Sequence, residues 1–115
     1  MKKILFHVDE MSKWNLTIKN VLNMLDYYEK EGTIVQLEIV ANSEAVSILT
    51  DNIDLELVKS LQKLANKKVV IAFCNNAIQA FHIEQAQIPG WISIVAAGVV
   101  EIAEKQLEGY AYIKP

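Results

Sequence analysis

Apolar and polar positions along the chain alternate between two patterns. Short apolar runs, rich in β-branched and aromatic residues, predict buried β-strands. They occupy residues 3–8, 34–40, 69–73, 91–95 and 110–113. Between them, apolar residues recur every three or four positions, which is typical of amphipathic α-helices. The chain therefore alternates strand and helix from beginning to end.

The predicted helices have recognisable ends and apolar faces. The first carries one stripe, formed by Trp14, Ile18, Val21, Leu22, Leu25 and Tyr28. Gly32 is placed to end it in the left-handed conformation that helix ends favour. A short helix over 44–49 follows, and Asp54 caps a third helix. A fourth begins at Asn76 and extends to Phe81 or His82.

The last helix follows the small residues Ala96, Ala97 and Gly98 and ends at Glu108 and Gly109. Its inward face is predicted to hold Val99, Ile102, Ala103 and Leu107. Glu101 and Lys105 are four positions apart and are expected to form an ion pair on it. The other acidic residues fall mostly on polar helix faces, where we expect solvent to surround them.

Strand–helix alternation with continuously apolar strands predicts an α/β fold. We expect one domain over residues 1–115, a three-layer α/β/α sandwich with a mostly parallel five-stranded sheet. In such sheets ligands bind at the carboxyl ends of the strands. The residues at those ends are His7 and Asp9, Asn42 and Ser43, Cys74 to Asn76, and Ala96 to Gly98.

Composition narrows the class of protein. The 115 residues carry a net charge of −3, and no basic cluster exceeds a lysine pair, which argues against nucleic-acid binding. The longest apolar runs are about five or six residues, whereas a membrane helix needs about 20. The N-terminal residues lack the apolar core of a secretory signal, so a cytoplasmic location is expected. Few helices must cover five strands, and the apolar surface left over favours a homo-oligomer.

Cys74 is the one residue that suggests chemistry. It comes where a strand passes into a helix, beside backbone N–H groups that have no intrahelical partner and favour a thiolate. The alternative is that Cys74 is a small buried apolar residue, as most free cysteines are. Asn75 or Asn76 would cap the helix or offer an amide to an anion. One cysteine excludes an internal disulfide.

The two histidines are expected to have different positions and roles. His82 lies about two helical turns beyond Cys74 and is expected at the surface or at an interface. His7 ends a strand on the same rim as Cys74, as a possible proton handler. The two can approach only if the first and third strands are neighbours in the sheet, and the sequence leaves the strand order open.

Metal and phosphate sites are not expected. The two histidines, the cysteine and the nearby acids lack the paired spacing of zinc ligands, and neither GxGxxG nor GxxxxGK[ST] occurs. No cofactor is expected. The N–H groups of Ala97 and Gly98 are candidates for binding an anion, although a tight strand-to-helix turn also calls for small residues.

Three segments resemble the DsrE/DsrF-like family: ILFHVDE over 4–10, VVIAFCNNAI over 69–78, and VAAGVVEIAEKQLEGYAYIKP over 95–115. The resemblance implies an α/β/α sandwich around a parallel five-stranded sheet, assembled as homotrimers or homohexamers. In the sulfur-relay members, the cysteine matching Cys74 accepts a persulfide sulfur from one protein and passes it to another. The chain departs from those members at Phe81, His82 and Ile83, where they often have an Arg-Gly-like element, and it has no second cysteine.

Two functional hypotheses follow. In the first, the chain is a sulfurtransferase-like carrier in which Cys74 accepts sulfane sulfur and transfers it as a persulfide. In the second, it is a non-catalytic oligomeric module that binds a small anionic ligand or a protein partner, with Cys74 as a packing residue. The expected site comprises Cys74 with His7, Asn75, Asn76, Ala97 and Gly98.

Overall fold

The structure is a computed structural model that describes residues 1–50 and 54–115. Its strands are β1 (Lys2–Val8), β2 (Val35–Ala41), β3 (Val70–Cys74), β4 (Ser93–Val95) and β5 (Ala111–Ile113). Its α-helices are α1 (Trp14–Lys30), α2 (Leu55–Asn66), α3 (Asn75–Ala80) and α4 (Gly98–Leu107). Three 3-10 helices lie between them: η1 (Met11–Lys13), η2 (Ser43–Leu49) and η3 (Gln85–Gln87). The segment over 44–49, predicted as a helix, thus forms as η2.

The described strands make one sheet in the order β4-β3-β2-β1-β5, with every neighbouring pair parallel. β1 and β2 pair along their whole lengths, from Lys2 opposite Val35 to Val8 opposite Ala41. β4 and β5 are three-residue edge strands. The predicted parallel five-stranded sheet is confirmed, and all strand carboxyl ends meet at one edge.

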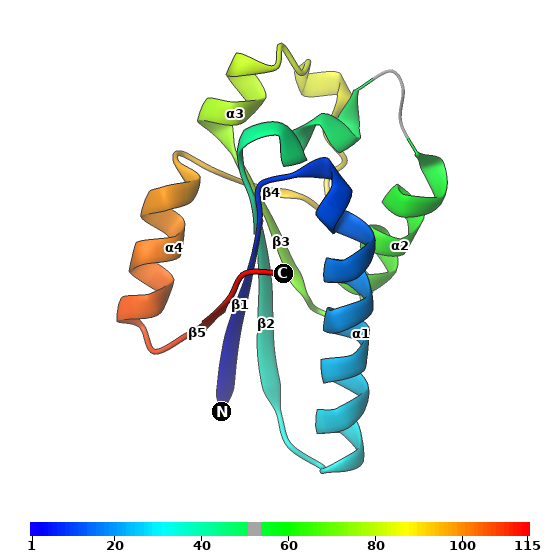
Figure 1. Cartoon of the computed structure of the whole chain (residues 1–115), viewed down its shortest axis with the longest axis vertical. Coiled ribbons are helices and arrows are strands. Elements are labelled where there is room, and N and C mark those ends of the chain that lie inside the picture. The colour runs from blue at the N-terminus through cyan, green and yellow to red at the C-terminus, as the bar shows by residue number, and fades with distance from the viewer. Residues whose placement is uncertain (51–53) are drawn as a thin grey trace.

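Helices cover both faces of this sheet, as Figure 1 shows. α1 and α2 lie on one face and α4 on the other, while α3 follows the carboxyl end of β3. The predicted three-layer α/β/α sandwich is therefore confirmed. Two helix ends form as predicted. Gly32, after α1, has φ +67°, and Asp54 caps α2 by accepting the Leu57 N–H on Oδ1 at 3.1 Å.

The larger core lies between the sheet and α1 and α2. The Trp14 ring stacks on Phe73 at 6.1 Å between centroids, and its Nε1–H donates to the Ala45 carbonyl at 3.0 Å. The smaller core lies under α4, where Ile102 covers Leu5, Val40 and Ala72. This second core is thin because α4 is the only described helix on that face (Figure 1).

Some predicted inward positions are wrong. On α4, Ile102 is buried as predicted, whereas Val99 and Leu107 are 67% and 82% exposed and Ala103 is exposed as well. Leu22 of α1 is 40% exposed. In each case the apolar stripe is broader than the surface that the helix covers, so its margins face solvent.

A buried acid interrupts the smaller core. Glu38 of β2 is only 2% exposed and points toward α4, contrary to the expectation of solvated acids. Lys105 Nζ lies 4.0 Å from Glu38 Oε1 and 3.7 Å from Glu108 Oε1, so its ion pairs differ from the predicted pair with Glu101. Lys105 Nζ also lies 5.4 Å from the centroid of the Tyr110 ring, so the lysine is turned toward the sheet.

Candidate functional site

Cys74 lies where the sequence predicts chemistry, at the junction of β3 and α3. It is the last residue of β3, paired with Val95 of β4, and it occupies the N-cap position of α3. Its side chain is buried, at 6% exposure, and forms part of the wall of a pocket of about 380 Å³. The thiol is therefore shielded from bulk solvent while facing a space that a small group can enter.

The pocket is built from three strand ends. Its described lining residues are Asn42, Ser43, Cys74, Asn76, Ala77, Ala80, Phe81, Ala97, Gly98 and Val99. They come from the start of η2, from α3 and from the first turn of α4. Of the predicted site residues, the structure thus brings Cys74, Asn76, Ala97 and Gly98 together, whereas Asn75 and His7 are not among the lining residues.

Gly98 stands at the centre of this arrangement. A Cβ atom at position 98 would lie 3.0 Å from Asn42 Cβ and 3.3 Å from Cys74 Cβ, closer than side chains normally pack. The small residues that open α4 therefore let the helix approach the ends of β2 and β3. The turn therefore needs small residues for close packing, which is one of the two roles predicted for it. This packing holds α4 and the ends of β2 and β3 around the thiol.

His7 does not reach Cys74 directly. The strand order places β2 between β1 and β3, so the histidine and the cysteine belong to strands that are not neighbours. Instead His7 Nε2 lies 2.9 Å from Asn42 Oδ1, and His7 Nδ1 lies 2.6 Å from Tyr112 Oη. The histidine is connected to the pocket through the Asn42 side chain.

Asn42 and Tyr112 are the residues that the sequence does not assign to the site. The strand-end argument places Asn42 on the rim, but its side chain makes no capping bond to η2 and binds His7 instead. Tyr112 comes from β5, whose position beside β1 depends on the strand order. The sequence signal that could have assigned Asn42 to the site is its place as a polar residue directly after a buried strand. Nothing in the sequence indicates that Tyr112 belongs to the site.

The backbone beside Asn42 is unusual. Ser43 has φ +51°, in the left-handed region that costs a residue with a side chain about 1–2 kcal/mol. This conformation starts η2 and turns the chain at the pocket wall. Strained residues of this kind cluster at functional sites.

The electrostatic character of the pocket is nearly neutral. Apart from the thiol, its described lining contributes two amides, one hydroxyl and apolar groups, with no charged side chain. An ion pair beyond the end of β1 joins Lys114 Nζ to Asp9 Oδ1 at 2.9 Å, and that hydrogen bond lowers the pKa of Asp9. His82 is exposed at the end of α3, as expected for a surface histidine.

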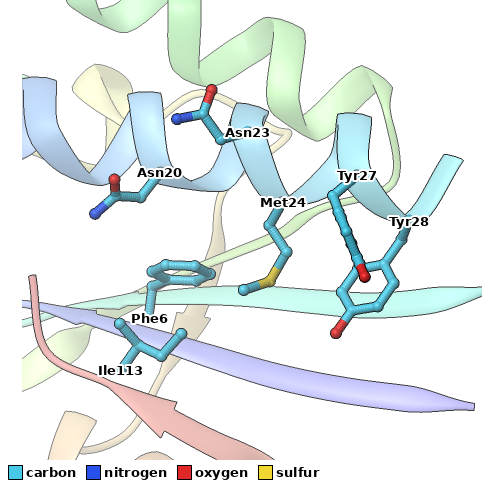
Figure 2. Close-up of a pocket in the computed structure, with 7 residues that line it drawn as sticks. All are labelled: Phe6, Asn20, Asn23, Met24, Tyr27, Tyr28 and Ile113. Carbon is cyan, nitrogen blue, oxygen red and sulfur yellow. The ribbon is translucent and has the colours of Figure 1, made fainter. Parts of the chain in front are cut away.

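A second pocket lies on the other side of the sheet, between α1 and the strands β1 and β5 (Figure 2). It measures about 370 Å³ and is lined by Phe6, Asn20, Asn23, Met24, Tyr27, Tyr28 and Ile113. Figure 2 shows Met24, Tyr27 and Tyr28 of α1 pointing down toward the strands, with the Met24 thioether reaching toward Phe6. The two pockets share no described lining residue.

In residues 1–50 and 54–115, no three His, Cys, Asp or Glu side chains are grouped so that they could hold a metal ion. Within the same residues, no helix combines the length and apolar character that crossing a membrane requires.

Comparisons with known proteins agree with this fold. The DsrE/DsrF-like family profile matches residues 2–115. A protein of unknown function from Methanobacterium thermoautotrophicum, MTH1491, has a similar structure, with a TM-score of 0.86, 28% sequence identity and 100% of both chains covered. The ychN protein from E. coli shares the fold, with a TM-score of 0.70, 17% identity and 100% of both chains covered. No curated protein matches the chain significantly. The chain therefore belongs to the DsrE/DsrF-like family, which is generally related to sulfur relay.

Proposed function

We propose that the chain is a sulfur carrier in which Cys74 accepts sulfane sulfur as a persulfide and passes it to an acceptor thiol. The observation that carries this proposal is the placement of the chain's single thiol in the wall of a pocket at the carboxyl end of the sheet. Membership of a family related to sulfur relay supports the same reading.

The transfer needs only one cysteine and no outside oxidant. The Cys74 thiolate attacks the outer sulfur of a donor persulfide, R–S–S–H. The sulfur–sulfur bond of the donor breaks, R–S⁻ leaves, and Cys74–S–S–H forms with the proton still on the transferred sulfur. The same exchange with an acceptor thiolate discharges the carrier, so sulfur moves without net oxidation or reduction. A second cysteine is not required for either step.

The pocket suits a small sulfur group better than a highly charged one. Its volume of about 380 Å³ leaves room beyond the thiol, and its described lining offers amide and hydroxyl hydrogen bonds without a cation. Burying a dianion without a paired cation is costly. We therefore expect a persulfide donor to load Cys74 much more readily than thiosulfate, which carries two negative charges.

The test is the mass of the protein after exposure to a sulfur donor. Purified protein is incubated with glutathione persulfide or with thiosulfate, and intact-mass spectrometry then looks for the addition of one sulfur atom. The Cys74→Ser variant is a clean control because the chain has no other thiol. The proposal predicts an adduct on the wild-type protein with glutathione persulfide and none on the variant.

A second measurement separates the carrier from its alternative. In the alternative, the chain is an oligomeric binding module and Cys74 is a packing residue, a reading favoured by its 6% exposure and its place in the main core cluster. Iodoacetamide alkylation that stays fast well below about pH 8 supports the carrier, since cysteine thiols ordinarily have a pKa near 8.5. A thiol protected until the protein unfolds, with no sulfur adduct, supports the binding module.

Self-association is part of the proposal. Val99, Val100 and Leu107 of α4 are 67%, 56% and 82% exposed, so this helix presents an apolar surface. We propose that copies of the chain cover it in a homotrimer or homohexamer, and that a sulfur donor or acceptor protein docks at the pocket. Analytical ultracentrifugation of the wild type and of Leu107→Lys tests the assembly, with Glu104→Lys on the same helix as the matched control. A monomeric wild type contradicts it.

We also propose that the chain works in the cytoplasm. A reducing compartment keeps a lone thiol free for sulfur exchange. Cell fractionation with an antibody to the protein tests this location.

A further inference from the structure

We infer that Asn42 binds the sulfur carried by Cys74, and that His7 and Tyr112 are positioning residues that aim the Asn42 amide at it. This inference rests on the proposed function, because it assigns the residues that hold the loaded state. It gives a role to a polar chain that crosses three strands, from β5 through β1 to the end of β2.

The first step is the position of Asn42. β2 and β3 pair up to Ala41 opposite Phe73, so Asn42 and Cys74 are the next residues of the two adjacent strands. Both contact the same point, the place where a Cβ atom of residue 98 would be. Asn42 Nδ2 lies 3.4 Å from that point, and both residues line the same pocket. The amide is thus beside the space that a second sulfur atom on Cys74 would enter.

The second step is the direction of the amide. Its Oδ1 lies 2.9 Å from His7 Nε2, so the neutral histidine must carry its proton on Nε2 and donate it to Asn42. His7 Nδ1 is then an acceptor, and the Tyr112 hydroxyl, 2.6 Å away, donates to it. Each bond fixes the polarity of the next, so the Asn42 oxygen is held by His7 and the NH₂ group is left for the pocket.

The third step is the chemistry of the loaded cysteine. Once Cys74–S–S–H loses its proton to water, negative charge rests on the terminal sulfur. The described pocket lining contains no cation, so hydrogen-bond donors must stabilise that charge. An amide N–H directed at the sulfur provides one, whereas a flipped amide would present its oxygen and repel the anion. With Oδ1 facing His7 Nε2 at 2.9 Å, a proton on Nε2 favours the amide orientation that leaves the NH₂ group to the pocket.

Three variants test the inference with glutathione persulfide as the probe. Asn42→Asp keeps the shape and the acceptor for His7 but replaces the NH₂ group with oxygen. Tyr112→Phe removes only the hydroxyl that fixes the histidine tautomer. Tyr27→Phe is the matched control, because Tyr27 is exposed on α1 and does not line the Cys74 pocket. Circular dichroism checks that each variant is folded.

The readouts are the equilibrium loaded fraction, measured by intact mass, and the ¹⁵N NMR spectrum of the His7 ring. We expect the loading constant to fall about tenfold or more in Asn42→Asp, since hydrogen bonds to charged groups are the stronger ones. We expect a fall of about two- to threefold in Tyr112→Phe, together with loss of the pure Nε2–H signature that we expect from the wild type. Tyr27→Phe should match the wild type in both readouts.

The outcomes separate this inference from the function on which it rests. If the wild type gains sulfur and a folded Asn42→Asp gains as much, Asn42 does not hold the sulfur, while the carrier function stands. An Nδ1–H tautomer for His7 in the wild type also overturns the inference, and this result does not depend on any variant. If the wild type gains no sulfur from glutathione persulfide, both proposals fail.

Discussion

Replacing Glu38 with glutamine should make the protein's stability much less sensitive to pH. Glu38 is buried under α4, and within the described structure its Oε2 has no hydrogen-bond partner. Burial raises the pKa of this carboxyl group from 4.5 to about 8, and the neighbouring carboxyl of Glu101 adds to the shift. Glu38 is therefore mainly protonated at neutral pH, when it can donate a hydrogen bond to Glu101.

The sign and size of the effect follow from that shift. Because the folded-state pKa is raised, the stability that Glu38 contributes is fully present below about pH 4.5. It is lost as the pH rises toward 8, since the unfolded chain releases a proton that the folded chain retains. Each pKa unit corresponds to about 1.4 kcal/mol, so raising the pH from 5 to 7 should cost the wild type about 2.5 kcal/mol through this group.

Urea unfolding followed by tryptophan fluorescence measures this cost, since Trp14 is fully buried in the folded chain. The free energy of unfolding is obtained for the wild type and for Glu38→Gln at pH 5, 6, 7 and 8. Glutamine keeps the size of the side chain and never ionises, so the variant should gain about 2.5 kcal/mol on the wild type between pH 5 and 7. Glu104→Gln, an exposed position on α4, is the control. Parallel pH profiles for the wild type and Glu38→Gln would refute the reasoning.

Three further substitutions test how the backbone holds the site. Gly98→Ala should lower the melting temperature and slow the alkylation of Cys74, because the added methyl group has no room. Gly90→Ala is the control and should change neither, since nothing lies within 4 Å of a Cβ atom there. Equal behaviour of the two variants would contradict the packing role of Gly98. Asp54→Ala should cost about 1 kcal/mol in urea unfolding by removing the cap of α2, and an unchanged midpoint would show that the cap is redundant. Gly32→Ala should cost about 1 kcal/mol or more because φ is +67° there, and a neutral result would argue against that conformation.

The fold could be predicted from the sequence because its signals are local. Continuous apolar runs mark strands that are covered on both faces, and the period of the intervening segments marks helices. Gly32 and Asp54 act on neighbouring backbone, so their roles were also predictable. An apolar stripe, however, does not reveal how much of its width a neighbour covers. Val99 and Leu107 were misplaced for that reason.

The site depends on information that adjacent residues do not carry. The apolar run of the third strand was enough to place Cys74 at a strand end. The distance between His7 and Cys74, however, depends on the strand order, which the sequence left open. Tyr112 joins the site only because β5 pairs with β1. Glu38 could not be identified as buried for the same reason, since its partners on α4 come from a distant part of the chain.

The pairing of β5 with β1 also has a consequence for biosynthesis. Three side-chain contacts on this seam each join residues 105 positions apart: Lys3 to Glu108, His7 to Tyr112, and Lys114 to Asp9. A ribosome makes β1 early and β5 after every other described element. While the chain is still growing, the outer edge of β1 is open and His7 lacks its tyrosine. The thiol of Cys74 thus leaves the ribosome before the polar chain beside it can be completed, so any contribution of this chain to the site begins only after β5 has been made.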